Sequence, residues 1–372
     1  MAIINHHSKP FDEGTLTKLE LFEDYAQEWI PTFVMSGHKN IWIFDFFAGP
    51  GYDLNGIPGS PIRLLTQIDS QIGNVFRMGV KVNVCFNEYD KHKHALLCNA
   101  CNDYIATHPD LQRAKGCNLL RVEYRNFDLA ELFPKTISTI AKYPSLVYLD
   151  QNGIKFLADS YLLELEKSET TDFLYYVSSS YILRFGNTPE FQNSLPIDVA
   201  KARLQPYKYI HQELLNQLRA KLPIETKLSL YPFTIKKRTN VYGVIFGASH
   251  PRGVEKFLRT AWSKNTQNGA ANFDIDDDIQ KIQLDIFEGK QLNKIEKFQQ
   301  ILRDEILSGR ITDNKRAFDF TLQQGHITPH ATKIVRELKQ RKMITYDAKQ
   351  PLISYENTYG KNKRIIAYKL VK

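Results

Sequence analysis

The sequence has few cysteines and no long apolar run, and both absences narrow the class of protein. Four cysteines among 372 residues are too few for a disulfide framework. The spacing of Cys98 and Cys101 resembles half of a zinc site, but no matching second pair of Cys or His lies nearby, so we expect no metal. No apolar run approaches the roughly 20 residues that span a bilayer. The first residues also lack a signal-peptide pattern, so a cytoplasmic protein is expected.

Positive charge is unevenly distributed along the chain. The formal net charge of the whole chain is +8. The segment from Thr328 to Lys372 holds eleven Lys or Arg against three Asp or Glu, which is a net charge of +8. The net charge of all the other residues is therefore about zero. A basic terminal segment on a neutral body indicates a polyanionic partner, most often nucleic acid.

Apolar patterns that are typical of strands and of helices alternate over the first half of the chain. The apolar spacing predicts a helix over 15–35 and a second helix over 91–107. Short apolar runs predict buried strands at 41–47, 80–86, 119–124, 146–149 and 173–177. Strands that alternate with helices indicate a parallel sheet covered on both faces. We therefore predict an α/β fold with a Rossmann-like sheet.

The pattern changes in the second half of the chain. Residues 228–234 and 241–248 flank a basic turn and are expected to pair as a closing hairpin, before a helix at 253–262. Amphipathic helices are then expected at 292–307, 314–324 and 328–341, and strands at 343–346 and 364–369. That order is typical of a winged helix. We expect a first domain over 1–264, a linker over 265–285 and a winged helix-turn-helix domain over 286–372.

A glycine-rich turn follows the first expected strand and forms the candidate cofactor site. Its residues are Asp45, Phe46, Ala48, Gly49 and Gly51. Ligands of open parallel sheets bind beyond the carboxyl ends of the strands. A carboxylate there is a poor neighbour for pyrophosphate but a good partner for the amino group of S-adenosylmethionine. The third glycine of the dinucleotide pattern is also missing, so the turn favours S-adenosylmethionine over NAD. The alternative is a tight turn with a capping aspartate.

Two later acids fit the same cofactor. Glu88 ends the second expected strand, where a carboxylate can accept both ribose hydroxyls. Asp128 follows the third expected strand, where a side chain can accept from an adenine amino group. Each acid taken singly is an ordinary surface residue at a strand end. Their common position after successive strands makes the cofactor reading stronger.

The candidate acceptor site is Asp150-Gln151-Asn152-Gly153, after the fourth expected strand. Many amino methyltransferases have an acid or amide here, followed by prolines and an aromatic residue, which together hold an exocyclic amine. This chain keeps the acid but replaces the prolines. Asp150 and Gln151 are the candidate catalytic residues, and a simple turn with Asp150 as a helix cap is the alternative. Three aromatic residues lie nearby: Tyr148, Phe156 and Tyr181. We expect them either to stack on a flipped base or to belong to the core.

The basic segment supplies candidate nucleic-acid contacts. Thr328 is expected to cap the last helix, whose polar face then carries His330, Lys333, Arg336 and Gln340. The tip of the final hairpin carries Lys361, Lys363 and Arg364, which suit flanking phosphates. A solvated helix and loop without a partner is the alternative.

Several motifs together resemble the three-Cys-motif partner family. They are the helix TKLELFEDYAQEWIP, the turn FDFFAGPG with GSP at 59–61, FNE at 86–88, and the D-x-x-G turn after strand four. The later segment VYGVIFGASHPRGVEKFLRTAW looks like the closing strand and helix of that family. The resemblance covers nearly the whole chain. It implies a class I methyltransferase fold, a C-terminal winged helix, and a partner protein with a three-cysteine cluster motif of the radical-S-adenosylmethionine type. Where family members tend to have proline after the strand-four aspartate, this chain has Gln151.

The function expected from these observations is transfer of a methyl group from S-adenosylmethionine to nucleic acid, at a base nitrogen. Two alternatives stay open. One is a catalytically silent, nucleic-acid-binding scaffold for the three-cysteine-cluster partner enzyme. The other is a methyltransferase that acts on a protein or a small molecule.

Overall fold

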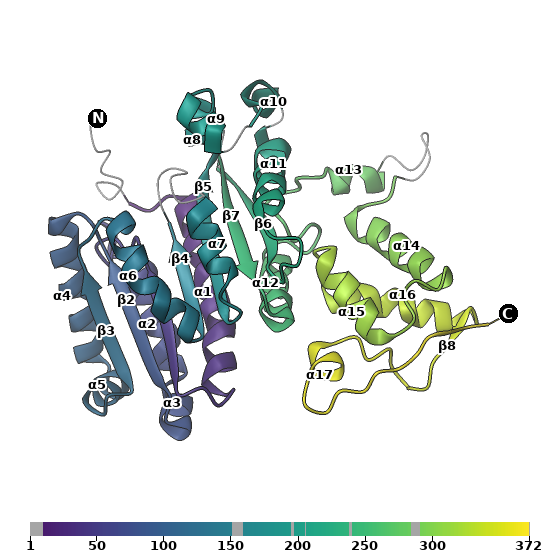
Figure 1. Ribbon diagram of the computed structural model, residues 1–372, viewed down its shortest axis with the longest axis horizontal. Helices are drawn as coiled ribbons and strands as arrows, with labels where there is room; N and C mark the ends of the chain where they lie inside the picture. Colours follow the sequence, from purple (N-terminus) through teal and green to yellow (C-terminus); the bar gives the residue numbers. More distant parts are fainter. Residues whose placement is uncertain are drawn as a thin grey trace. The chain divides into compact units, whose positions relative to one another are not determined.

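A seven-stranded sheet organises the N-terminal unit, Met1–His250 (Figure 1). The strand order is β3-β2-β1-β4-β5-β7-β6. Strands β1 to β5 are parallel, and β7 is antiparallel to both of its neighbours, β5 and β6. The strands are β1 Asn40–Asp45, β2 Lys81–Asn87, β3 Leu120–Arg125, β4 Ser145–Leu149, β5 Thr171–Ser178, β6 Ser229–Lys237 and β7 Asn240–Ala248. The expected parallel sheet and its closing hairpin are confirmed.

The computed structural model describes residues 10–150, 159–194, 197–204, 206–237, 240–283 and 291–371. Its contacts divide the chain into two compact units, Met1–His250 and Pro251–Lys372. The helices of the first unit are α1 Glu13–Val34, α2 Ser60–Ser70, α3 Ile72–Met78, α4 Lys91–Thr107, α5 Pro109–Gly116, α6 Leu129–Lys142, α7 Asp159–Glu166, α8 Ser179–Phe185, α9 Pro189–Ser194, α10 Val199–Leu204 and α11 Pro206–Lys221. No helix in these ranges is both long and apolar enough to cross a membrane.

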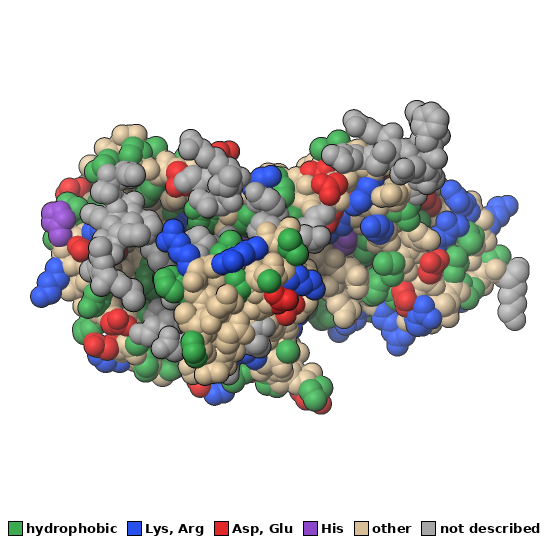
Figure 2. Space-filling model, turned by 90° about the horizontal axis from the view of Figure 1, so that it is seen from above, with side chains coloured by type: hydrophobic (Ala, Val, Ile, Leu, Met, Phe, Trp, Pro, Cys, Tyr) green, Lys and Arg blue, Asp and Glu red, His purple; other side chains and the backbone are tan. Residues whose placement is uncertain are grey.

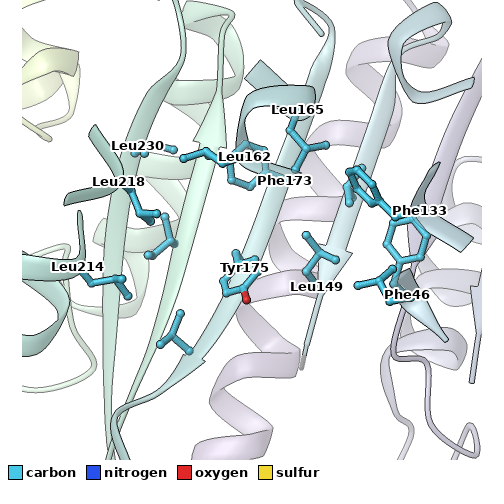
Figure 3. Close-up of a cluster of buried hydrophobic side chains, with 14 of the residues drawn as sticks. Phe46, Phe133, Leu149, Leu162, Leu165, Phe173, Tyr175, Leu214, Leu218 and Leu230 are labelled. Carbon is cyan, nitrogen blue, oxygen red and sulfur yellow. The ribbon is translucent and has the colours of Figure 1, made fainter. Parts of the chain in front are cut away.

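Side chains that alternate along the strands pack against helices on both faces of the sheet. On one face, Val147 and Leu149 of β4 join a buried cluster with residues of α6, α7 and α11, and Figure 3 shows Phe46, Phe133 and Leu149 among them. On the other face, α1 packs through Phe22, whose ring stacks on Tyr148 with centroids 4.0 Å apart. Burial of apolar side chains on both faces explains the continuous apolar runs of the central strands.

The C-terminal unit, Pro251–Lys372, contains the three helices expected for a winged helix. Its elements are α12 Pro251–Lys264, α13 Asp278–Gln283, α14 Lys294–Leu307, α15 Asn314–Gln323, α16 Thr328–Gln340, β8 Ile344–Thr345, α17 Tyr355–Thr358 and β9 Lys369–Leu370. Helix α12 groups with this unit, whereas the sequence placed it in the first domain. Its Trp262 donates a 2.9 Å hydrogen bond to the carbonyl of Gly325 and packs against His326.

The expected final strand, 364–369, does not form as one continuous strand. Ala367 makes an isolated antiparallel bridge with Asp313, and Lys369–Leu370 pairs with β8. The buried side chain of Asn314 explains the difference. Its amide donates to the carbonyls of Leu352 and Arg364, and its oxygen accepts from the amide of Ile366. One side chain of α15 therefore satisfies backbone groups that a partner strand would otherwise satisfy.

Candidate functional site

The glycine turn after β1 is held by backbone contacts that need small residues. The amide of Ala48 donates to the carbonyl of Asn87, at the end of β2. Gly49 and Gly51 have φ angles of +66° and +94°, which L side chains rarely adopt. A Cβ at Gly51 would lie 2.7 Å from the Cβ of Ala100 on α4. The turn therefore keeps its backbone packed close to the ends of β1 and β2.

Asp45 anchors the start of this turn from inside the protein. Its side chain is 0% exposed, and its carboxylate accepts hydrogen bonds from the hydroxyl of Ser60 (2.6 Å) and the amide of Phe47 (3.1 Å). Burial is the main cause that raises the pKa of Asp45 to about 7. The two hydrogen bonds act against this rise, and the negative charges of Asp150 and Glu88 contribute to it. An acid in this state ionises more readily when a cation binds beside it.

Glu88 is fixed by two backbone amides. Its Oε2 accepts from Gly49 (3.1 Å) and its Oε1 from Asp90 (2.8 Å). Burial raises the pKa of this carboxyl group, against the effect of these hydrogen bonds. Because a carboxylate has about four acceptor sites, each oxygen can still accept from one further donor.

Two asparagines that were not among the predicted site residues connect the strand ends. Asn87 is buried, and its amide group donates to the carbonyls of Phe46 and Phe127 at 3.1 Å each. Asn126 donates to the carbonyl of Glu88 at 2.7 Å. These bonds tie the ends of β1, β2 and β3 together. The only signal in the sequence was an asparagine directly before the acid in FNE and before the phenylalanine in NFD.

The other expected cofactor residues lie at the same edge but differ in their roles. The side chain of Asp128 caps α6 by accepting from the amide of Ala130 at 2.8 Å, and it is half-buried. The ring of Phe46 is 1% exposed and packs in the core against Phe133, with centroids 6.0 Å apart. Any contact of Phe46 with a ligand is therefore made by its backbone.

Asp150 pairs with a lysine that was not among the predicted site residues. Nζ of Lys18, on α1, forms an ion pair with Oδ2 of Asp150 and lies 4.3 Å from the centroid of the Tyr176 ring. Lys18 comes 132 residues before its partner, so no local pattern could reveal the contact. Gln151 lies outside the described residues.

The aromatic residues suggested for base stacking need a correction. Tyr148 is 1% exposed and stacks on Phe22, so its ring belongs to the core and cannot receive a base. Phe156 lies outside the described residues. Tyr181 lies on α8, and its side chain is likewise not described.

Among the described residues, no group of three or more His, Cys, Asp or Glu side chains is arranged to hold a metal ion. The four cysteines are free thiols, and Cys101 is buried while Cys98 is half-buried. Asp45, Glu88 and Asp150 follow or end β1, β2 and β4, and both other acids raise the pKa of Asp45. This edge of the sheet therefore concentrates negative charge and favours a cationic ligand.

The outer face of α16 carries a surface groove of about 500 Å³. Residues that line it include Thr328, Thr332, Lys333, Arg336, Glu337 and Gln340. Lys333 and Arg336 are exposed, as expected, and Nε of Arg336 donates to the side chain of Gln350 at 2.8 Å. Ile334, Val335 and Leu338 are buried on the opposite face.

Two expectations for α16 are wrong. The cap residue is Ile327, whose side chain has no capping group, and Thr328 is already helical. His330 does not lie on the basic face. Its ring packs edge-on against Trp262, with centroids 4.5 Å apart, and its Nδ1 lies 3.1 Å from Nδ1 of His326.

The loop before β9 exposes its basic residues. Lys361, Lys363 and Arg364 are all exposed, and Arg364 donates to the carbonyl of Asp347 at 2.7 Å. Figure 2 shows several blue Lys and Arg side chains on the C-terminal unit, at the right of the view. The unit thus presents positive charge on both the helix and the loop.

Comparisons with known proteins give the class of the C-terminal domain. A family described as the GMT-like wHTH domain matches residues 272–351. A solved structure of Trm1 from Pyrococcus horikoshii, in complex with S-adenosyl-L-methionine, is 11% identical, with a TM-score of 0.34. The match covers 68% of this chain and 59% of the Trm1 chain, so this chain spans less than two thirds of the length of Trm1. No curated protein matches the sequence. The chain combines a Rossmann-like, mostly parallel sheet of the class I methyltransferase type with a C-terminal winged helix-turn-helix domain.

Proposed function

We propose that this protein transfers a methyl group from S-adenosylmethionine to a base nitrogen of nucleic acid. The observation that carries the proposal is the group of three carboxylates, Asp45, Glu88 and Asp150, beside a glycine turn at the carboxyl edge of the sheet. S-adenosylmethionine carries an ammonium and a sulfonium charge, which this edge attracts. The pyrophosphate of a dinucleotide would meet repulsion from the same acids.

The residues at the edge fit this cofactor. Glu88 has one acceptor site left on each oxygen, which suits a pair of ribose hydroxyls. Asp128 suits the adenine amino group, and the backbone of Ala48, Gly49 and Gly51 suits close approach of the methionine part. Asp45 would act from below the turn, as a buried charge opposite the ammonium. When bound, the cofactor supplies an electrophilic methyl group.

Asp150 is the residue that meets the acceptor in this proposal. Its carboxylate would accept a hydrogen bond from the exocyclic amine, which directs the nitrogen lone pair away from the carboxylate and toward the cofactor. After transfer the nitrogen must lose a proton, and the same carboxylate can take it. Gln151, which follows directly, is the second candidate of this site.

The C-terminal unit supports nucleic acid as the acceptor. The match to a winged helix-turn-helix domain, the groove of α16 and the exposed charges of Lys333, Arg336, Lys361, Lys363 and Arg364 all suit a phosphate backbone. A base within a duplex would have to leave the stack to reach Asp150. The proposal also includes a three-Cys-motif partner protein and a cytoplasmic location. Both are expectations based on sequence patterns alone.

The test compares Asp150→Asn with wild type. Tritiated S-adenosylmethionine is offered with duplex DNA, structured RNA and protein from the source cells, and cofactor affinity is measured by calorimetry. We expect labelled nucleic acid from wild type and a loss of transfer of at least about 100-fold in the variant. Cofactor affinity should fall much less, by at most about tenfold, because Asp45 and Glu88 remain. Asp103→Asn, an exposed acid on α4, is the matched control and should change neither quantity.

Three outcomes would contradict the proposal in different ways. Cofactor binding without transfer to any substrate would favour the scaffold alternative. Transfer of the label to protein alone would show that the acceptor is a protein and not nucleic acid. Binding of NAD but not of S-adenosylmethionine would overturn the whole assignment.

A further inference from the structure

Lys18 brings a positive charge to the edge of the sheet where the acids gather. It lies near the start of α1, and its side chain is 9% exposed, against 21% for its partner Asp150. Among the described residues, no other ion pair involves Asp45, Glu88 or Asp150. A buried ammonium group loses its hydration, so it persists only where a partner charge compensates it. Lys18 and Asp150 therefore depend on each other.

The surroundings of this pair make it part of the site. Burial is the main cause that raises the pKa of Asp45, Tyr148 and Tyr176, and the charge of Asp150 adds to the rise in each of the three groups. The ammonium of Lys18 lies over the ring of Tyr176, which holds it by a cation–π contact at 4.3 Å. The ion pair engages Oδ2 of Asp150. Among the described residues, no hydrogen bond reaches Oδ1 of Asp150, so this oxygen keeps its acceptor sites.

We propose that Lys18 is a positioning residue of the acceptor site, which orients the carboxylate of Asp150 through Oδ2 and balances its charge. The inference rests on the proposed function. With Oδ2 engaged by Lys18, Oδ1 accepts the hydrogen bond of the acceptor amine. As the bond from nitrogen to the methyl carbon forms, the bond from sulfur to that carbon breaks and its electron pair stays on sulfur. The surplus proton on nitrogen passes to Oδ1.

Binding measurements test the charge without any acceptor. S-adenosylmethionine and S-adenosylhomocysteine differ by one methyl group and one positive charge, at the atom that faces the acceptor. In Lys18→Met the carboxylates lose their counter-charge, so preference for the charged form should rise by about threefold to tenfold. Lys18→Arg should keep the wild-type preference. Lys115→Met, an exposed lysine on α5, is the matched control and should also keep it.

Lys18→Gln separates charge from hydrogen bonding and guards against a folding defect. It keeps a donor for Oδ2 but carries no charge, so its preference should match that of Lys18→Met. Thermal unfolding of each variant shows whether the comparison concerns folded protein. If Lys18→Met does not fold, the comparison of Lys18→Gln with Lys18→Arg decides the question.

Turnover gives the second readout. Lys18→Met should lower kcat at least about tenfold with a smaller change in KM for the cofactor, and Lys18→Arg should restore most of the rate. Adding Lys18→Met to Asp150→Asn should cost little more, because both act through one carboxylate. An unchanged preference between the two ligands, or additive losses, would overturn the role of Lys18 alone. Failure to bind either ligand would instead overturn the proposed function.

Discussion

The hydroxyl of Ser60 donates a 2.6 Å hydrogen bond to the buried carboxylate of Asp45. This bond joins the end of β1 to the first turn of α2. The amide of Gly59, which caps α2, donates to the carbonyl of Gly51 at 2.8 Å, and Pro61 lies in the first turn of the helix. The segment Gly59-Ser60-Pro61 is therefore the second half of the glycine turn, although seven residues separate it from Gly51.

Removal of this hydroxyl should destabilise the fold in a pH-dependent way. Ser60→Ala leaves a buried carboxylate without one of its donors, and we expect a loss of about 1.5–3 kcal/mol in urea unfolding at pH 8. The hydrogen bond favours the ionised acid, so the loss should be smaller at pH 6, where Asp45 is mostly protonated. Ser70→Ala, at the exposed end of the same helix, is the control. Equal losses for the two variants would contradict the role of Ser60.

Cofactor affinity should depend on the ionisation of Asp45. Burial raises the pKa of Asp45 to about 7, so below pH 7 the carboxyl group is mostly neutral and cannot attract an ammonium. Binding of a cation therefore releases a proton, and affinity should fall by up to about tenfold per unit as pH drops below 7. Calorimetry in two buffers of different ionisation enthalpy measures the proton release.

Asp172 supplies the matched control for this titration. It is also buried with a pKa raised to about 7, but it lies near the start of β5 and bonds to the hydroxyl of Tyr25 at 2.6 Å. It thus lies at the opposite edge of the sheet. Asp45→Asn should abolish the pH dependence of binding, whereas Asp172→Asn should leave it. The reverse result would remove Asp45 from the site.

Glu88→Gln should weaken cofactor binding without unfolding the protein. The variant keeps one carbonyl acceptor but replaces the second oxygen by a donor, which cannot accept a ribose hydroxyl. We expect a loss of about 1.5–3 kcal/mol in binding free energy, the range for a hydrogen bond to a charged group. Glu131→Gln, an exposed acid on α6, should bind as wild type does. Unchanged affinity in Glu88→Gln would remove the ribose assignment.

The sheet and the strand-end acids could be predicted because their signals are local. Continuous apolar runs mark β1, β2 and β4, and α4 was predicted with its observed bounds, Lys91–Thr107. The acids follow directly from where those strands end. The ion pair between Lys18 and Asp150 could not be predicted in this way, because the two residues are 132 positions apart in the sequence.

The errors have the same origin. Helical spacing placed His330 on the basic face of α16, but Trp262, 68 residues earlier, gives its ring a buried partner. Periodicity likewise predicted a strand at 364–369, but the side chain of Asn314 bonds to the carbonyl of Arg364 and the amide of Ile366 instead. Periodicity assigns a residue to a face of its own element. Contacts with distant side chains decide how that face is used.

The paired histidines should make the C-terminal unit sensitive to acid. Burial lowers the pKa of His326 to about 2 and that of His330 to about 4, with Lys294 adding to both effects. In the unfolded chain both groups bind protons near pH 6.5, so stability should fall as pH drops from about 6.5 toward 4. Hydrogen exchange in α14 and α16 should therefore accelerate over this range beyond its intrinsic change. His326→Leu should reduce the acceleration, and His92→Gln, an exposed histidine of α4, should not.

The basic loop should bind phosphate without regard to sequence. The loop before β9 exposes Lys361, Lys363 and Arg364. These residues suit the phosphate backbone that flanks the major groove, if that groove receives α16. Changing all three to Glu should weaken binding to duplex DNA and to structured RNA alike. The slope of the logarithm of affinity against the logarithm of salt concentration should also become shallower, by about one unit for each lost phosphate contact. The same reversal at Lys39, Lys115 and Lys142, exposed lysines of the N-terminal unit, controls for net charge. If the loop variant and wild type bind with equal affinity and equal slope, the loop does not touch nucleic acid. The winged helix would then be assigned to a protein partner, because its exposed charges would have no polyanion to meet.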